Sequence, residues 1–331
     1  MTNQAIDDKD AESFLTVLVL AIGEEALQAI SALHQQYDEI RKPYLRYVLV
    51  QLSCDAITEP TNDSVLLLDD AALRIDAQGL PSTDMLDYLQ RCCGARFQGA
   101  DAIFIMADFS DKRCITVTSC LGFLLSQQTI SHQALLISVV NEKRHFKPGT
   151  NREQFEQGLD ALRQYCDTLI VNESSDIEQG LLQAVPRLTS SFPLEIQALV
   201  EVFSLFAVSF WYPGLIGVDF ADIYPLVRKT TDSIFVSAQG VGEDCAALAA
   251  NEAISRLQQH WGNLSANDIS VLANVCGASL SYNDLEIIGD IFCSQISEIA
   301  EIVISTGIEA KVIENSIVIR VLFVKSNKLK S

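Results

Sequence analysis

Positive charge is scarce in this sequence. Lys and Arg together number 23, against 43 Asp and Glu, which leaves a formal net charge of −20. A surface with this balance repels phosphate groups, so nonspecific binding to nucleic acid or to anionic lipid is disfavoured. We therefore expect no nucleic acid among the partners of this chain.

Metal-binding motifs are also absent. The nine cysteines form no CxxC pair, and the four histidines form neither HxH nor HExxH. Cys92 and Cys93 are adjacent, a spacing that makes a poor metal clamp. An odd number of cysteines, most of them in apolar runs, favours reduced thiols in a core. The sequence predicts no metal site.

The start of the chain has no long hydrophobic run. Its first residues, MTNQAIDDKDAES, are acidic and polar, unlike a signal peptide. The apolar run at residues 14–22 is too short to span a bilayer. We expect a cytoplasmic protein with no direct membrane insertion.

Apolar strands alternate with helices along the chain. Hydrophobic residues make up 49% of its 331 residues, enough for one large or two ordinary domains. The alternation predicts an α/β fold with a doubly wound, mainly parallel, Rossmann-like sheet. Strands are expected at residues 14–22, 45–54, 65–68, 101–107, 133–140, 168–172, 233–238, 269–276, 300–305 and 316–325. Helices are expected at residues 26–36, 83–93, 115–127, 153–165, 194–211, 243–259 and 282–298.

The helix at residues 194–211 is apolar nearly all round, with Glu195 and Glu201 as its only charges. A helix of this composition is expected to be buried between two lobes, and at this length it spans roughly 27 Å. We predict three parts: a nucleotide-binding-type domain at residues 1–190, the central linking helix at 191–212, and a smaller C-terminal α/β domain at 213–331.

Four segments resemble FtsZ, the bacterial tubulin-like cell division protein. Residues 214–223 read GLIGVDFADI and resemble the family pattern GLxNVDFADV. Residues 240–255 (GVGEDCAALAANEAIS), 285–291 (LEIIGDI) and 99–105 (GADAIFI) resemble three further segments of that family. The resemblance to the FtsZ/tubulin superfamily implies the tubulin/FtsZ-like fold, with a GTPase-like domain before the central helix.

The phosphate-binding loop of that family is replaced here. In FtsZ a glycine-rich loop, GGGTGTG, wraps the phosphates of GTP, and the resemblance places it at residues 110–116, which read SDKRCIT. Every glycine is gone, so side chains stand where backbone would have to approach phosphate. Lys112 and Arg113 could attract an anion, although two basic residues on a polar loop more often form a solvated face.

Other nucleotide contacts of the family are changed too. The turn after the first strand keeps only Gly23, while Glu24 and Glu25 occupy the helix start, where they satisfy the helix dipole and repel phosphate. The family's ribose and base segment, FxxEGxxR, corresponds to residues 146–152, FKPGTNR, in which the glutamate is missing. Gly149 and Arg152 of that segment match.

The position that reads guanine in FtsZ falls at Gln197, five residues after Phe192. A Gln side chain cannot accept from both guanine N–H groups as a carboxylate can. We therefore expect that GTP is not a cofactor of this chain and that the chain has no catalytic residue for its own nucleotide. The vestigial site would consist of Gly23, Glu24, Glu25, Lys112, Arg113, Arg152, Phe192 and Gln197.

The loop that in FtsZ reaches the neighbour's nucleotide is better preserved. Asp219 and Asp222 match the two acids that polarise the water attacking the neighbour's GTP, but Gly217 replaces an asparagine. These acids would act only in trans, at an interface. By local chemistry alone, Asp219 is a helix N-cap and Asp222 a first-turn acid, which suffices for both residues. Both interpretations stay open, and Gly217 favours the second.

The leading hypothesis is an FtsZ-like pseudo-GTPase, a scaffold or interaction protein of bacterial cell division or the cytoskeleton that caps or modulates FtsZ-type filaments. Its partner would be a second copy of itself or an FtsZ-type protein. One alternative is a nucleotide-independent, self-assembling scaffold in membrane remodelling. The other is a GTPase with a rebuilt phosphate site that uses Lys112, Arg113 and Arg152. The chain ends soon after its last predicted strand, so the family's membrane-linking tail peptide is not expected.

Overall fold

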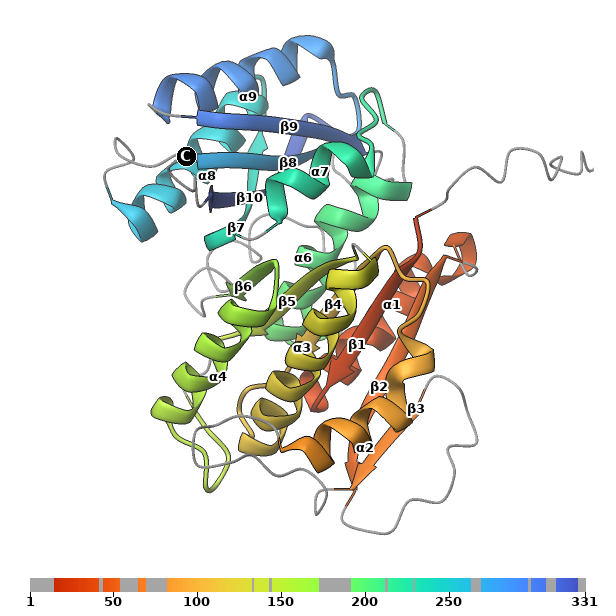
Figure 1. Ribbon diagram of the computed structural model, residues 1–331. Coiled ribbons are helices and arrows are strands. Elements are labelled where there is room, and N and C mark those ends of the chain that lie inside the picture. The colour runs from red at the N-terminus through yellow and green to blue at the C-terminus, as the bar shows by residue number, and fades with distance from the viewer. Residues whose placement is uncertain are drawn as a thin grey trace, which may run out of the picture.

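The structure is a computed structural model, shown in Figure 1. It describes residues 15–41, 44–53, 65–69, 82–132, 134–142, 145–172, 192–211, 214–228, 230–262, 269–296, 299–307 and 314–326. Cys54 and Pro213 lie outside these ranges, as do both predicted limits between domains, at 190/191 and 212/213.

The first part of the chain forms a six-stranded, wholly parallel sheet. Its strand order is β3-β2-β1-β4-β5-β6. The strands are β1 (Val17–Ile22), β2 (Leu45–Ser53), β3 (Val65–Asp69), β4 (Ala102–Ala107), β5 (Leu135–Asn141) and β6 (Thr168–Asn172). The predicted doubly wound α/β sheet is confirmed.

Helices cover both faces of this sheet, as the alternation of buried side chains requires. Val17 and Val19 of β1 pack with α1 (Glu24–Arg41) and α6 (Leu194–Trp211). Leu18 and Leu20 pack on the other face with α2 (Thr83–Cys93), α3 (Lys112–His132) and α4 (Arg152–Tyr165). A short 3₁₀ helix, η3 (Gly94–Arg96), follows α2.

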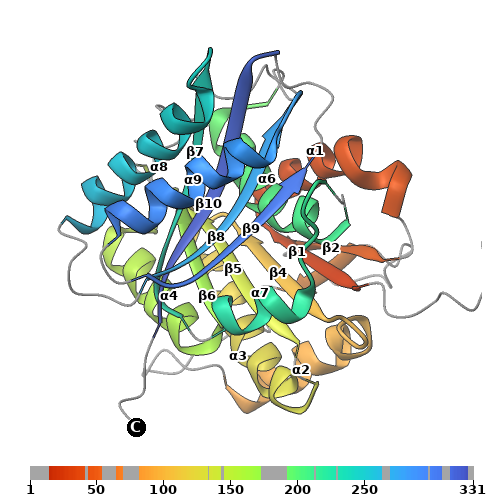
Figure 2. The ribbon, with the colours of Figure 1, turned by 90° about the horizontal axis from the view of Figure 1, so that it is seen from above.

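The second part of the chain forms a four-stranded mixed sheet of order β7-β10-β8-β9. Its strands are β7 (Thr230–Val241), β8 (Ile269–Gly277), β9 (Ile299–Gly307) and β10 (Ser316–Ser326), and its helices are α7 (Phe220–Val227), α8 (Cys245–Trp261) and α9 (Tyr282–Gln295). Strand β10 is antiparallel to β7 and β8, whereas β8 and β9 are parallel. Figure 2 shows this sheet lying across the first one.

Helix α6 joins the two sheets and has the predicted bounds. By length and composition it is the one helix within the described residues that could cross a membrane, but 78% of it is buried inside the protein. Its side chains share one core with strands of both sheets, such as Phe104 of β4 and Leu322 of β10. The helix is therefore a central core element, as its apolar composition predicts.

A buried ion pair ties α6 to the second sheet. The Nε of Arg320 in β10 donates to Oε2 of Glu201 over 2.5 Å, and Arg320 is fully buried. A second buried contact joins the hydroxyls of Ser209 in α6 and Ser305 in β9 at 2.6 Å. These polar contacts fix which side chains of α6 face the second sheet.

Several helix limits differ from the sequence predictions: α1 and α3 are longer at both ends, α4 begins one residue earlier, and α8 lies two residues later in the chain. Residues up to 113 were expected in a loop, but α3 begins at Lys112 because Asp111 caps it: Oδ1 of Asp111 accepts from the backbone N–H of Arg113 over 2.9 Å. The helix expected at residues 282–298 ends at Gln295. Residues 297 and 298 lie outside the described residues.

The two sheets also meet along their edge strands, β6 and β7. The backbone N–H of Thr230 donates to the carbonyl of Asp167 over 2.8 Å, and the hydroxyl of Thr168 donates to the carbonyl of Val227. Farther along, Oγ of Ser233 donates to the carbonyl of Leu169 over 2.5 Å. Hydrogen bonds thus join the two edge strands near the start of β6 and of β7.

Candidate functional site

Most of the predicted site residues gather at the carboxyl ends of the parallel strands. We call this region the carboxyl-end face; it comprises residues 23–25 after β1, 108–113 after β4, 141–152 after β5 as far as they are described, and 192–197 at the start of α6. Ligands of open α/β sheets bind at such edges. The loops come together here although they are far apart in the sequence.

The turn between β1 and α1 leaves no space for a side chain at Gly23. Its φ is 89°, and a Cβ added there would lie 2.8 Å from Cβ of Asp108. Glu24 and Glu25 form the first turn of α1. Glu24 lies 3.9 Å from the Nζ of Lys147, and Glu25 accepts a 3.4 Å hydrogen bond from Asn141. Carboxylates therefore occupy the helix end that would attract a phosphate.

The loop between β4 and α3 contains several hydrogen bonds between its own residues. Arg113 donates to both carboxylate oxygens of Asp111, with Nη2 at 2.6 Å from Oδ2. The hydrogen bond from the Arg113 side chain lowers the pKa of Asp111 below its usual value, against the effect of burial. The backbone N–H of Ser110 donates to Oδ1 of Asp108, which is itself buried. The charge of Arg113 is thus matched within its own loop.

The loop that leads to α4 lies against this one. The backbone N–H of Lys112 donates to the hydroxyl of Thr150 over 2.8 Å, and that of Lys147 donates to the carbonyl of Ser110 over 2.8 Å. The ammonium of Lys112 lies near Gly149, 3.7 Å from where a Cβ would stand. Lys112 and Lys147 are both exposed. The two loops form one hydrogen-bonded surface.

Arg152 is engaged by two carboxylates. It stands at the start of α4, where Nη1 donates to Glu142 over 3.0 Å and Nε donates to Glu156 over 2.7 Å. The hydrogen bond to Glu142 and then the charge of Glu156 raise the pKa of the guanidinium further above its usual value. Any anion at this position competes with both acids.

The start of α6 forms the remaining part of the carboxyl-end face, next to the end of β5. The amide of Gln197 donates to the carbonyl of Phe192 over 2.7 Å. Buried Asn141 donates to the carbonyl of Glu195 over 2.8 Å and accepts from Asn172 over 3.0 Å. Neither of these asparagines nor Lys147 was predicted from the sequence as a site residue. Polar residues that directly end two buried strands, as Asn141 and Asn172 do, were the available signal.

The 214–219 loop lies elsewhere, beyond the other end of α6. Asn141 of the carboxyl-end face bonds to the first turn of α6, whereas this loop follows the last turn. A helix of 18 residues separates its ends by about 27 Å. The loop is fixed to β9, because the backbone N–H of Ile216 donates to the hydroxyl of Thr306 and that of Thr306 donates to the carbonyl of Ile216.

Asp219 and Asp222 are both exposed on this loop and the helix that follows it. Asp219 is the N-cap of α7, and Oδ2 of Asp222 accepts from the backbone N–H of Asp219 over 3.1 Å. Nothing lies within 4 Å of a Cβ added at Gly217. Asp222 therefore serves as a cap while both carboxylates remain accessible to another molecule.

The described part of the chain has cysteine, histidine and acidic side chains, but they do not gather into a metal site. It contains no group of three or more His, Cys, Asp or Glu side chains that could hold a metal ion. Its eight cysteines are free. Burial raises the pKa of the Cys93, Cys114, Cys120 and Cys166 thiols to about 12. These four are packing residues rather than nucleophiles.

Comparisons with known proteins point to one superfamily. No family model matches the chain. The cell division protein FtsZ of Haemophilus influenzae is 29% identical over 217 residues, covering 64% of this chain and 50% of that protein. The mitochondrial division protein fszA of Dictyostelium discoideum is 22% identical over 207 residues, covering 60% and 40%. The chain thus spans about half the length of the curated relatives it matches, or less.

Solved structures agree on the fold. An empty FtsZ dimer of M. jannaschii has a TM-score of 0.69 and 18% identity, covering 96% of this chain and 90% of that one. CetZ of Methanosaeta thermophila has a TM-score of 0.63 and 11% identity, covering 93% and 86%. Sequence similarity and fold together support an FtsZ/tubulin superfamily protein with a divergent sequence.

Proposed function

We propose that this chain is a cytoplasmic, FtsZ-like pseudo-GTPase that acts as a scaffold or interaction protein in bacterial cell division or the cytoskeleton. The observation that carries the proposal is the pairing of charges at the carboxyl-end face. Arg113 is bonded to Asp111, Arg152 to Glu142 and Glu156, and Lys147 lies 3.9 Å from Glu24. Three of the cations that could hold phosphates, Arg113, Lys147 and Arg152, thus have acids of the same chain beside them.

Electrostatics at the helix ends supports the same proposal. A phosphate that approached the first turn of α1 would meet Glu24 and Glu25 instead of bare backbone N–H groups. At the first turn of α3, residues 110–113 carry side chains on every position, so the backbone cannot wrap a phosphate chain closely. Both helix ends that would cradle a nucleotide are thus unsuited to it.

Calorimetry with GTP and Mg²⁺ tests this proposal. We expect no binding heat at micromolar protein concentration. The double variant Glu24→Gln/Glu25→Gln provides a matched comparison, because it removes the repelling charges without changing side-chain size. Micromolar binding by the parent chain would overturn the proposal and favour a GTPase with a rebuilt phosphate site at Lys112, Arg113 and Arg152.

Interaction with a partner would use the 214–219 loop. Asp219 and Asp222 are exposed there, at the opposite end of α6 from the carboxyl-end face. We propose that this loop docks on the nucleotide face of an FtsZ-type protein, where it caps or modulates a filament. A chain whose own carboxyl-end face accepts no further subunit would stop growth at that point.

Sedimentation and GTPase assays of an FtsZ-type protein test the docking. We expect the parent chain to reduce pelleted polymer and to change the GTPase rate. Asp219→Ala/Asp222→Ala should remove both effects, whereas Asp84→Ala, an exposed first-turn acid on α2, should keep them. If neither polymer mass nor GTPase rate responds to the parent chain, filament modulation is wrong.

Self-assembly without nucleotide is the second candidate. It is favoured by the fold shared with a protein solved as an empty FtsZ dimer. Light scattering after size exclusion would show dimers or longer species without added nucleotide, and the Asp219→Ala/Asp222→Ala variant would reduce them. A monomer at all concentrations would contradict this candidate while leaving the docking on FtsZ-type proteins open to its own assay.

A further inference from the structure

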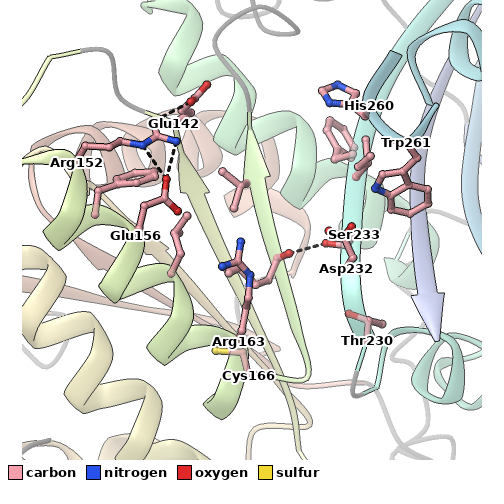
Figure 3. A pocket seen from close by; sticks show the side chains of 16 residues that line it. Glu142, Arg152, Glu156, Arg163, Cys166, Thr230, Asp232, Ser233, His260 and Trp261 are labelled. Atoms are coloured by element: carbon pink, nitrogen blue, oxygen red, sulfur yellow. Dashed lines mark hydrogen bonds and ion pairs between the residues drawn. The ribbon is translucent and has the colours of Figure 1, made fainter. Parts of the chain in front are cut away.

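A cavity of about 320 Å³ lies between the edges of the two sheets, outside the 214–219 loop and the first turns of α1 and α3 (Figure 3). Its walls come from α4 and β6 on one side and from β7 and the end of α8 on the other. Pockets for small molecules usually begin at about 300 Å³ and often lie between domains. Its size and place both suit a small ligand.

Among the described residues, hydrogen bonds join the edges of the two sheets near the start of β6 and β7, beside the cavity. Thr230 and Ser233 of β7 bond to the chain around β6, at the carbonyls of Asp167 and Leu169. Beyond these contacts the lining comes from Val171 on one strand and Phe235 on the other. The pocket is thus fixed by hydrogen bonds at one end.

Apolar and aromatic side chains supply part of the lining. Phe155 and Leu159 project from α4, Leu169 and Val171 from β6, and Phe235 and Trp261 from the other wall. A ring or an aliphatic body placed against them would lose its contact with water, which favours binding at roughly 25 cal/mol per Å² of apolar surface. The lining therefore suits a ligand with an apolar body.

Among the described residues that line the pocket, Arg163 is paired with fewer carboxylates than Arg152. Arg152 is held by Glu142 and Glu156, and the carboxylate of Asp232 lies 3.7 Å from Lys325. Arg163 points into the pocket in Figure 3, and its one hydrogen bond given by the structure goes to Asp160 over 2.7 Å. A guanidinium has five N–H donors, so Arg163 can bind a further acceptor.

We propose that this pocket binds a small amphipathic molecule with an aromatic or aliphatic body and a single anionic group. The body lies against Phe155, Val171 and Phe235, and the anion accepts hydrogen bonds from Arg163. A nucleoside triphosphate does not fit this description, because three carboxylates, those of Glu142, Glu156 and Asp232, line the same pocket. The site is thus chemically distinct from a GTP site.

A bound molecule would contact both parts of the chain, because the walls of the pocket belong to α4 and β6 on one side and to β7 and α8 on the other. Its binding would stabilise the present arrangement of the two parts of the chain by mass action. The proposal does not depend on the scaffold function, because its assay needs neither GTP nor a protein partner.

Two dyes test it on the full chain. Anilinonaphthalene sulfonate has an aromatic body and one sulfonate, and N-phenyl-1-naphthylamine has the same body without the charge. We expect saturable, one-to-one fluorescence enhancement by both dyes, with the sulfonate about fivefold tighter because it bonds to a half-exposed guanidinium.

Three variants locate the binding. Arg163→Gln should abolish the preference for the sulfonate, and Val171→Trp should block both dyes by filling the pocket. Arg91→Gln, an exposed arginine in the last turn of α2, should change neither. Circular dichroism confirms that each variant is folded. Should Val171→Trp misfold, Arg163→Gln on the surface of α4 still decides.

The proposal fails if the parent chain shows no saturable dye binding. It also fails if folded Val171→Trp binds both dyes as the parent does, or if the preference for the sulfonate is absent or survives Arg163→Gln. Loss of binding in Val171→Trp together with loss of the preference in Arg163→Gln supports it.

Discussion

The carboxyl-end face and the 214–219 loop resemble two regions of FtsZ-type proteins. They differ in their charged side chains, which are paired on the face and, among the described residues, unpaired by basic residues on the loop side. At the carboxyl-end face, Arg113 and Arg152 are held by acids of this chain. On the loop side, Asp219 and Asp222 are exposed, and no basic side chain is bonded to them among the contacts the structure gives. A charge that is already paired must lose its partner before it binds another molecule, whereas an exposed one need only lose water.

Helix α6 lies between these two regions. The ion pair of Glu201 with Arg320 joins this helix to the second sheet, so we expect the largest loss of stability when that pair is broken. Glu201→Gln removes the carboxylate from buried Arg320 while keeping the side-chain size. We expect the free energy of unfolding to fall by about 3–5 kcal/mol, because a buried guanidinium is left without its counter-charge. Urea denaturation measures the change.

The double variant Glu201→Met/Arg320→Met is the control for that experiment. It replaces both charges with apolar side chains of similar length, so its stability should return to within about 1 kcal/mol of the parent or exceed it. A double variant as unstable as the single one would show that packing, and not the uncompensated charge, causes the loss.

Much of the fold follows from local sequence chemistry. The apolar runs at β1, β4 and β5 predict strands buried on both faces, and the apolar stretch at 194–211 predicts a central buried helix. Arg320 was not predicted to be special. It stands in the apolar strand IVIRVLFV of β10, but its partner on α6 is 119 residues away, and only the folded chain brings the two together.

The next largest difference in stability is expected from replacing one glycine in each region by alanine. Gly23 has a φ of 89° and no room for a Cβ beside Asp108, whereas nothing lies within 4 Å of a Cβ at Gly217. Gly23→Ala should destabilise the chain by about 2–3 kcal/mol through backbone strain and overlap. Gly217→Ala should stay within about 0.5 kcal/mol of the parent. Thermal and urea unfolding of both variants compare the two regions directly; equal losses would contradict the difference in local space.

The candidate site was only partly predictable. The loss of glycines at residues 110–116 and the acids at Glu24 and Glu25 are visible in the sequence, because a phosphate site needs particular residue types at particular positions. The pairing of Arg113 with Asp111 and the contact of Lys147 with Glu24 are not visible, since they depend on rotamers and on how the loops approach each other. The cavity beside β6 depends on both sheets and had no sequence signal.

A smaller loss of stability is expected when the capping side chain of Asp222 is removed. Asp222→Ala removes the acceptor for the backbone N–H of Asp219 and should lower the free energy of unfolding by about 0.5–1 kcal/mol. Asp84→Ala, at an exposed first-turn acid of α2, should cost less, because the cap of that helix comes from the hydroxyl of Ser82. Urea denaturation compares the pair. Equal costs would mean that the Asp222 hydrogen bond contributes nothing to stability.

An effect of similar size, which depends on pH, is expected at the carboxyl-end face. Arg113 lowers the pKa of Asp111 in the folded chain, so the carboxylate contributes stability above its unfolded pKa of about 4, and this is lost as pH falls through the lower folded value. Asp111→Asn should therefore cost about 0.5–1 kcal/mol at pH 7, a modest value because the Arg113 side chain is 48% exposed. The difference between parent and variant should shrink below pH 4. Urea denaturation from pH 7 to pH 3 measures it, and a difference that stays constant over this range would show that the ion pair is not its source.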